Sequence, residues 1–166
     1  MQLPFNIPND DIALPLPTDA LIAKTEESLG VSFPEDVKAF LKEFNGANLR
    51  YATFFAAGHE WCIDRFLNLL PHGSDTTLAV YGIETTWSQL DERMAEDPEG
   101  IGAELVPLVV LFAGDFVCLD YRKTKENPPV VVWLHEESRL LKPSTRPVAE
   151  TFTEFMGMIH PDEPSD

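Results

Sequence analysis

The sequence predicts an α+β fold in a single domain, with a mainly antiparallel sheet and helices packed on one face of that sheet. Three observations lead to this prediction. The chain has 166 residues, 44% of them hydrophobic, which is enough for one domain with a substantial core. Helical patterns of apolar residues stand near both ends of the chain, and strand patterns occupy much of the stretch between them. Short loops separate successive strand patterns, which favours antiparallel pairing.

The chain divides into a Pro-rich N-terminal arm, one domain and an acidic tail, at residues 1–17, 18–160 and 161–166. The arm has four prolines and lacks the basic cluster that begins a secretory signal, so we expect an extended segment and no signal peptide. A first helix is expected from about Asp19 to Leu29. Thr18 or Asp19 can cap it, and Gly30 is placed to end it in a left-handed conformation.

A second helix is predicted directly after the first. Ser32 and Glu35 fit a capping box, and Pro34 falls in the first turn, where its missing N–H costs little. Spacings of i, i+3, i+4 and i+7 give this helix one apolar face, formed by Val37, Phe40, Leu41 and Phe44. The pair Asn45–Gly46 is expected to stop the helix.

The middle and C-terminal parts alternate between strand and helix patterns. Two strands joined near Gly58 are expected between Leu49 and Leu70, a third helix from about Ile83 to Ala95, and a loop over Asp97–Gly102. Later strands are expected at about Leu105–Phe112, Phe116–Tyr121 and Val130–Leu134, with a short one near Leu140–Leu141. A closing helix that starts near Pro147 would point five apolar side chains inward: Val148, Phe152, Phe155, Met156 and Ile159.

The most informative stretch is the hairpin-like run from Phe112 to Glu136. A Gly114–Asp115 turn precedes its first strand, and a polar loop closed by Pro128–Pro129 separates the two strands. Four of its residues have side chains that can serve in catalysis or binding: Cys118, Asp120, Tyr121 and Trp133. No catalytic or metal motif lies in this run, so the pattern by itself predicts a fold element and not an activity.

The charge excludes some partners. Asp and Glu total 28 against 12 Lys and Arg, which gives a net charge of −16 and a pI near 4.4. Nucleic acids and anionic membranes are bound by cationic surfaces, so we expect direct contact with neither. The longest apolar run, Leu105–Ala113, contains a proline and is too short to span a bilayer. An acidic surface favours a basic partner, or serves solubility.

No metal, cofactor or catalytic site is expected. His59, Glu60 and Cys62 resemble part of a ligand set, but no second ligand pair completes it. The favoured interpretation of Cys62 and Cys118 is that both are small buried hydrophobic residues. A weaker hypothesis is a hydrolase that uses Asp120, Tyr121 and His135. The favoured interpretation is that Asp120 binds turn backbone while Tyr121 packs.

A partner-binding surface is the remaining hypothesis. Trp61 and Trp133 lie in strand patterns, which favours a core role, but large aromatic residues also anchor protein partners. Turn and strand-end acids beside them extend the candidate set. The candidate partner-binding residues are Trp61, Asp115, Asp120, Tyr121, Trp133, Glu136 and Glu137.

Three segments together resemble the SUKH superfamily, specifically its Smi/Knr branch. They are IAKTEESLGVSFPEDVKAFLKEFNGA at residues 22–47, LVPLVVLFAGDFVCLDYRKTKENPPVVVWLHE at residues 105–136 and VAETFTEFM at residues 148–156. The middle segment is the most specific, with its Gly-Asp turn, its Cys-Leu-Asp-Tyr strand and its Pro-Pro-Val-Val strand ending in Trp. The chain departs from the pattern at Phe33, where the family has leucine, and matches little between Leu70 and Gly102.

The resemblance implies a non-catalytic binding protein. Many bacterial members look like immunity proteins that act in the cytoplasm on toxins, often nucleases or deaminases. Nuclease toxins present cationic clefts to phosphates, so a cognate toxin domain with a basic surface would suit a chain of charge −16. The alternative is an intracellular scaffold or regulatory adaptor of the same superfamily, and a weaker alternative is a hydrolase.

Overall fold

The computed structural model describes residues 3, 6–49, 52–94, 104–138 and 143–160, and of residues 91–94 only the backbone. Three predictions therefore fall outside the described residues: the loop Asp97–Gly102, the short strand near Leu140–Leu141 and the acidic tail 161–166.

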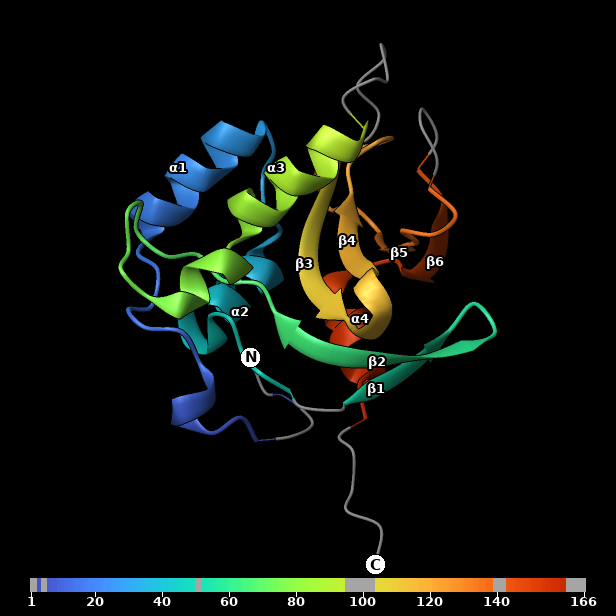
Figure 1. Ribbon diagram of the computed structural model, residues 1–166, viewed down its shortest axis with the longest axis horizontal. Coiled ribbons are helices and arrows are strands. Elements are labelled where there is room, and N and C mark those ends of the chain that lie inside the picture. Colours follow the sequence, from blue (N-terminus) through green and yellow to red (C-terminus); the bar gives the residue numbers. More distant parts are fainter. Residues whose placement is uncertain (1–2, 4–5, 50–51, 95–103, 139–142, 161–166) are drawn as a thin grey trace, which may run out of the picture.

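The described residues form one six-stranded antiparallel sheet in chain order, β1-β2-β3-β4-β5-β6 (Figure 1). The strands are β1 (Thr53–Ala56), β2 (His59–Phe66), β3 (Leu105–Leu111), β4 (Phe116–Asp120), β5 (Val130–Trp133) and β6 (Thr145–Ala149). The α-helices are α1 (Asp19–Leu29), α2 (Glu35–Phe44), α3 (Ile83–Met94) and α4 (Phe152–Met158). Short 3-10 helices are η1 (Asn9–Asp11), η2 (Thr77–Tyr81) and η4 (Phe112–Gly114). The predicted α+β domain with an antiparallel sheet is confirmed.

The first two helices lie where the local pattern places them. Thr18 caps α1 by accepting a hydrogen bond from the Leu21 N–H at 3.2 Å, and Gly30 ends it at φ 70°. The predicted capping box of α2 is wrong, because Pro34 occupies the N-cap position and no side chain caps this helix. Ser32 lies two residues before the N-cap, outside the helix.

The C-terminal prediction also needs correction. Residues around Pro147 and Val148 form β6, an edge strand paired with β5, and not the start of a helix. Edge strands tolerate proline because one side of the strand needs no ladder hydrogen bonds. The helix α4 begins later, at Phe152, where the Thr151 hydroxyl accepts a hydrogen bond from the Glu154 N–H at 3.0 Å.

Both faces of the sheet carry apolar residues. Because strand side chains alternate, neighbouring residues of β4 and β5 belong to different clusters. The main core, shared with α1, α2 and α4, includes Val117, Leu119, Val130 and Val132. The second cluster comprises Leu90, Leu105, Cys118, Val131 and Trp133. The helix α3 begins in the main core and reaches the second cluster at Leu90, so it lies across the sheet from α4 (Figure 1). The helices therefore cover both faces of the sheet, and not only one face as the sequence predicts.

The register brings several turns to one end of the sheet. Phe116 at the start of β4 pairs with Trp133 at the end of β5, so the turns next to these residues are neighbours. Ile63 pairs with Leu111 at the end of β3, and β2 therefore extends past this point toward β1. The β1–β2 hairpin projects from the body on this side (Figure 1). We call this the hairpin end of the sheet.

The N-terminal arm lies on the body beside the end of α2. The Ala13 N–H donates to the Asn45 carbonyl oxygen at 2.7 Å, and the Asn48 N–H donates to the Asp11 carbonyl oxygen at 2.9 Å. Ala13 is only 1% exposed. The arm is thus fastened to the same residues that end the second helix.

Candidate functional site

The structure gathers five of the seven candidate residues at the hairpin end. Trp61 lies at the start of β2, Asp115 directly before β4, and Trp133 at the end of β5, followed by Glu136 and Glu137. The other two candidates, Asp120 and Tyr121, lie at the opposite end of β4. The candidate set therefore divides into two groups with different surroundings.

Aromatic and acidic side chains share the surface at the hairpin end. Phe55 is 64% exposed and pairs across the hairpin with Glu60, while Phe112 is 47% exposed directly after β3. We define the hairpin surface by seven residues: Phe55, His59, Glu60, Trp61, Phe112, Glu136 and Glu137. Sequence reasoning missed Phe55 and Phe112. The signal for Phe55 was its position beside Phe54 in a strand pattern: adjacent strand residues face opposite sides, and a strand that is covered on one side buries only one of them.

Trp61 is held within the hairpin, and Glu137 lies near His59 of that hairpin. The half-buried Trp61 donates from Nε1 to the Ala56 carbonyl oxygen at 3.3 Å, and its ring meets that of His59 edge-on at 5.8 Å. Hydrogen bonds from Ser144 and Arg146, with the nearby His59, hold the pKa of Glu137 below its ordinary value. The hairpin and the turn after β5 thus form one surface.

Asp115 has a structural role within this end of the sheet. Its Oδ1 accepts a hydrogen bond from the His135 N–H at 3.0 Å and lies 2.7 Å from Nδ1 of the same residue. A Cβ on Gly114 would lie 3.4 Å from the His135 ring, and φ there is +92°, so glycine suits this turn. Asp115 therefore fixes the turns that present Phe112 and Glu136.

Asp120 forms a two-point ion pair with Arg122 at the other end of β4. Arg122 donates from Nε to Oδ1 and from Nη2 to Oδ2, both at 2.8 Å, and from Nη2 to the Thr145 hydroxyl at 3.0 Å. Burial alone would raise the pKa of Asp120, but the hydrogen bonds and charge of Arg122 outweigh it and lower that pKa. Asp120 thus helps hold β6 to the sheet.

Tyr121 and Trp133 lie inside the protein, 5% and 1% exposed. The Tyr121 hydroxyl donates to the Ser32 carbonyl oxygen at 2.7 Å, and burial, aided by the charge of Glu26, raises its pKa. Cys118 is fully buried, as predicted, and burial with the nearby Asp120 raises the pKa of its thiol. The same prediction is wrong for Cys62, which is only half-buried in β2. Buried aromatic groups support the sheet and offer a partner no contact area.

The residues of the hydrolase hypothesis are not brought together. His135 binds Asp115 at the start of β4, whereas Asp120 ends that strand and Tyr121 follows it. Five residues of extended strand separate the two aspartates by about 16 Å. A nucleophile, base and orienting group must lie within hydrogen-bond reach of one another, and this arrangement does not provide that.

Within the described ranges, no three His, Cys, Asp or Glu side chains cluster as ligands of a metal ion would. No helix of the described part has the length and apolar character needed to cross a bilayer.

Comparison with models of protein families supports the resemblance seen in the sequence. The model of a family described as the SMI1 / KNR4 family (SUKH-1) matches residues 16–158 of the chain. This range contains the four α-helices and six strands of the described residues and both groups of candidate residues, whereas η1 lies before it. The comparison with curated proteins found no match.

Proposed function

Since the chain belongs to the SMI1/KNR4 family (SUKH-1), we propose that it is a non-catalytic immunity protein, which neutralises a cognate bacterial toxin by covering the toxin's active site. The compartment we propose is the cytoplasm of the cell that it protects. The observation that carries the proposal beyond family membership is the hairpin surface, where exposed aromatic rings stand among unburied acids.

The composition of the hairpin surface suits a protein interface. Interface centres are enriched in aromatic residues, and a few such residues carry most of the binding energy. Phe55 and Phe112 expose large apolar side chains, and neither belongs to the main core. The register places Phe55 and Glu60 on one face of the hairpin and Trp61 on the other, where its half-buried ring packs against the core. Phe55 and Phe112 would form the apolar centre of the contact, and Trp61 would support the hairpin that presents Phe55.

The acids of the hairpin surface suit a basic partner. Glu60 is exposed, and the Glu136 side chain is 86% exposed. With a net charge of −16, the whole protein attracts cationic surfaces at long range. A toxin that binds phosphates has such a surface at its active site, so steering by charge would deliver the inhibitor to the cleft that it must cover.

The test searches the neighbourhood of the gene for a toxin gene and pairs this protein with the toxin domain found there. Co-expression should restore growth of cells that produce the toxin, and the purified pair should form a complex. Phe55→Ser and Phe112→Ser should each weaken the complex by roughly 5- to 150-fold, because an interface aromatic contributes on the order of 1–3 kcal/mol. The matched control is Val80→Ser. Val80 is 62% exposed on η2, which is tied to the other end of β2 through Asn68 and Tyr81.

The electrostatic part has its own readout. Association should slow as ionic strength rises, and Glu136→Gln should lower the association rate several-fold, whereas Glu27→Gln on α1 should not. If both Phe variants bind the toxin as tightly as the wild type does, the interface lies elsewhere on the protein. Recovery of only an endogenous partner, with no protection from the toxin, would favour the scaffold or adaptor function.

A further inference from the structure

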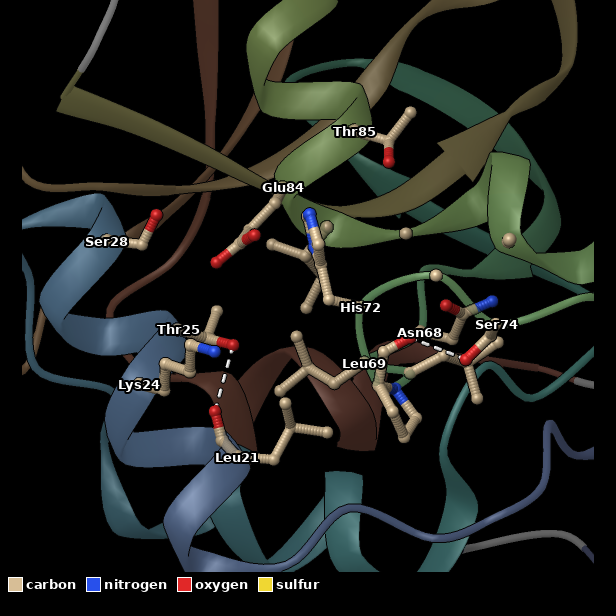
Figure 2. A pocket seen from close by; sticks show the side chains of 16 residues that line it. Leu21, Lys24, Thr25, Ser28, Asn68, Leu69, His72, Ser74, Glu84 and Thr85 are labelled. Atoms are coloured by element: carbon tan, nitrogen blue, oxygen red, sulfur yellow. Dashed lines mark hydrogen bonds between the residues drawn. The ribbon is translucent and has the colours of Figure 1, made fainter.

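A second concave site lies away from the hairpin surface. It is a cavity of about 490 Å³ between α1, the segment Asn68–Ser74 and the first turn of α3 (Figure 2). Its volume falls in the range of small-molecule sites, about 300–1,000 Å³. The apolar part of its lining includes Leu21, Leu69 and Ile83.

The walls of the cavity are held by buried hydrogen bonds. Leu69 donates its N–H to Asn45 Oδ1 at 2.8 Å, and its carbonyl oxygen accepts from Asn45 Nδ2 at 2.9 Å. The Asn68 N–H donates to the Tyr81 carbonyl oxygen, and the Asn68 carbonyl oxygen accepts from the Ile83 N–H, both at 2.9 Å. Both asparagines are almost fully buried. The cavity is therefore formed before any ligand arrives, which reduces the entropy lost on binding.

Charged groups of both signs line this cavity. Lys24 of α1 and His72 of the loop are exposed at its rim, and Glu84 of α3 is half-buried in its wall. Figure 2 shows the Glu84 and His72 side chains projecting into the space in front of α1, which carries Lys24. None of these three side chains forms an ion pair or hydrogen bond with another described residue. By contrast, the lysines of α2 are both paired with acids: Lys38 and Lys42.

We propose that the cavity binds a small zwitterion, an α-amino acid or short peptide with an apolar side chain. The ligand carboxylate would pair with Lys24, its ammonium group with Glu84, and its side chain with the apolar lining. An anion alone would face Glu84 unpaired, and a cation alone would face Lys24. A zwitterion satisfies both charges at once, and charge-assisted hydrogen bonds are the strong ones.

Titration calorimetry of the full-length protein tests this with L-leucine and L-leucyl-L-leucine, which distinguish a free amino acid from a peptide. N-acetyl-leucine lacks the ammonium group, and leucinamide lacks the carboxylate. Each should bind about tenfold or more weakly than the zwitterion of the same size, the equivalent of one lost charge-assisted hydrogen bond.

Two variants connect the charges to the ligand groups. The Lys24→Gln variant should have the same affinity for leucine as for leucinamide, because it has no partner for the carboxylate. The Glu84→Gln variant should have the same affinity for leucine as for N-acetyl-leucine, because it has no partner for the ammonium group. The controls, Lys125→Gln and Glu27→Gln, remove exposed charges outside the cavity lining and should leave binding unchanged.

Melting curves of all four variants check the fold separately. No heat with either zwitterion at the highest soluble concentration, or equal affinity for the one-charge analogues, overturns the proposal. Because the cavity and the hairpin surface share no residue, neither outcome affects the proposed toxin binding.

Discussion

Replacing Asn45 by alanine should lower the unfolding free energy of this protein by more than most single substitutions do. Asn45 is 0% exposed and makes three hydrogen bonds. Its Nδ2 donates to the Leu69 carbonyl oxygen at 2.9 Å and to the Ala13 carbonyl oxygen at 3.3 Å, and its Oδ1 accepts from the Leu69 N–H at 2.8 Å. The substitution leaves these three backbone groups without that partner.

The expected loss of unfolding free energy is about 3 kcal/mol. A buried hydrogen bond is worth about 1 kcal/mol net, and an abandoned buried partner costs about 1–3 kcal/mol; the 3.3 Å bond counts for less. For a chain of this length, the melting temperature should fall by roughly 6–12 °C. Urea unfolding with linear extrapolation measures the free energy directly. The matched control is Gln89→Ala, which removes an exposed amide from α3 and should change stability by less than about 0.5 kcal/mol.

A second variant separates hydrogen bonding from packing. Asn45→Asp keeps the acceptor for the Leu69 N–H but sets a carboxylate against two carbonyl oxygens. Such a carboxyl prefers its neutral form, so its folded pKa would lie above the unfolded value of about 3.9. Its destabilisation should therefore be full at pH 7 and shrink as the pH falls through that raised pKa. A loss below about 1 kcal/mol in Asn45→Ala would refute the reasoning, as would a pH-independent deficit in Asn45→Asp.

Three further perturbations test separate parts of the fold. Tyr121→Phe should cost about 1–2 kcal/mol in urea unfolding, because it strands a backbone carbonyl group of the α1–α2 loop; no change would mean that water replaces the hydroxyl. Arg122→Gln should cost about 2 kcal/mol at pH 7. Since the pKa of Asp120 is lowered in the folded protein, the ion pair stabilises the protein above about pH 4 and this stabilisation is lost on acidification. The difference in unfolding free energy between Arg122→Gln and wild type should therefore be smaller at pH 3 than at pH 7; an equal difference at both pH values would contradict this. Gly46→Ala should be more damaging than Gly30→Ala: both have positive φ, but only at Gly46 would a Cβ meet another side chain, at 2.8 Å. Equal melting temperatures would remove steric overlap as the cause.

Elements defined by nearby residues were predictable. Thr18 and Gly30 bound the first helix through contacts within one turn, and the apolar spacing of α2 reflects the helical period itself. The strands at Leu105–Leu111 and Val130–Trp133 are apolar runs buried on both faces, which their sequences show directly. These features needed no knowledge of the rest of the chain.

The errors concern features that depend on distant partners. Pro147 suits either a helix start or an edge strand, and only the pairing of β6 with β5 distinguishes them. Asn45 has the sequence signature of a helix stop, but its main role is to bind Leu69, 24 residues away. A side chain of this type gives no local sign of which buried backbone group it will meet.

The candidate site follows the same division. The sequence by itself determined the fold class, the acidic character of the protein and the resemblance to its family, because these are carried by composition and by residues close together in the chain. The tertiary structure decided which aromatic residues are exposed, with Trp133 inside and Phe55 outside. It also decided that Lys24 and Glu84 line one cavity although 60 positions separate them in the chain. Burial and proximity are set by contacts between segments that only the assembled sheet and its covering helices bring together.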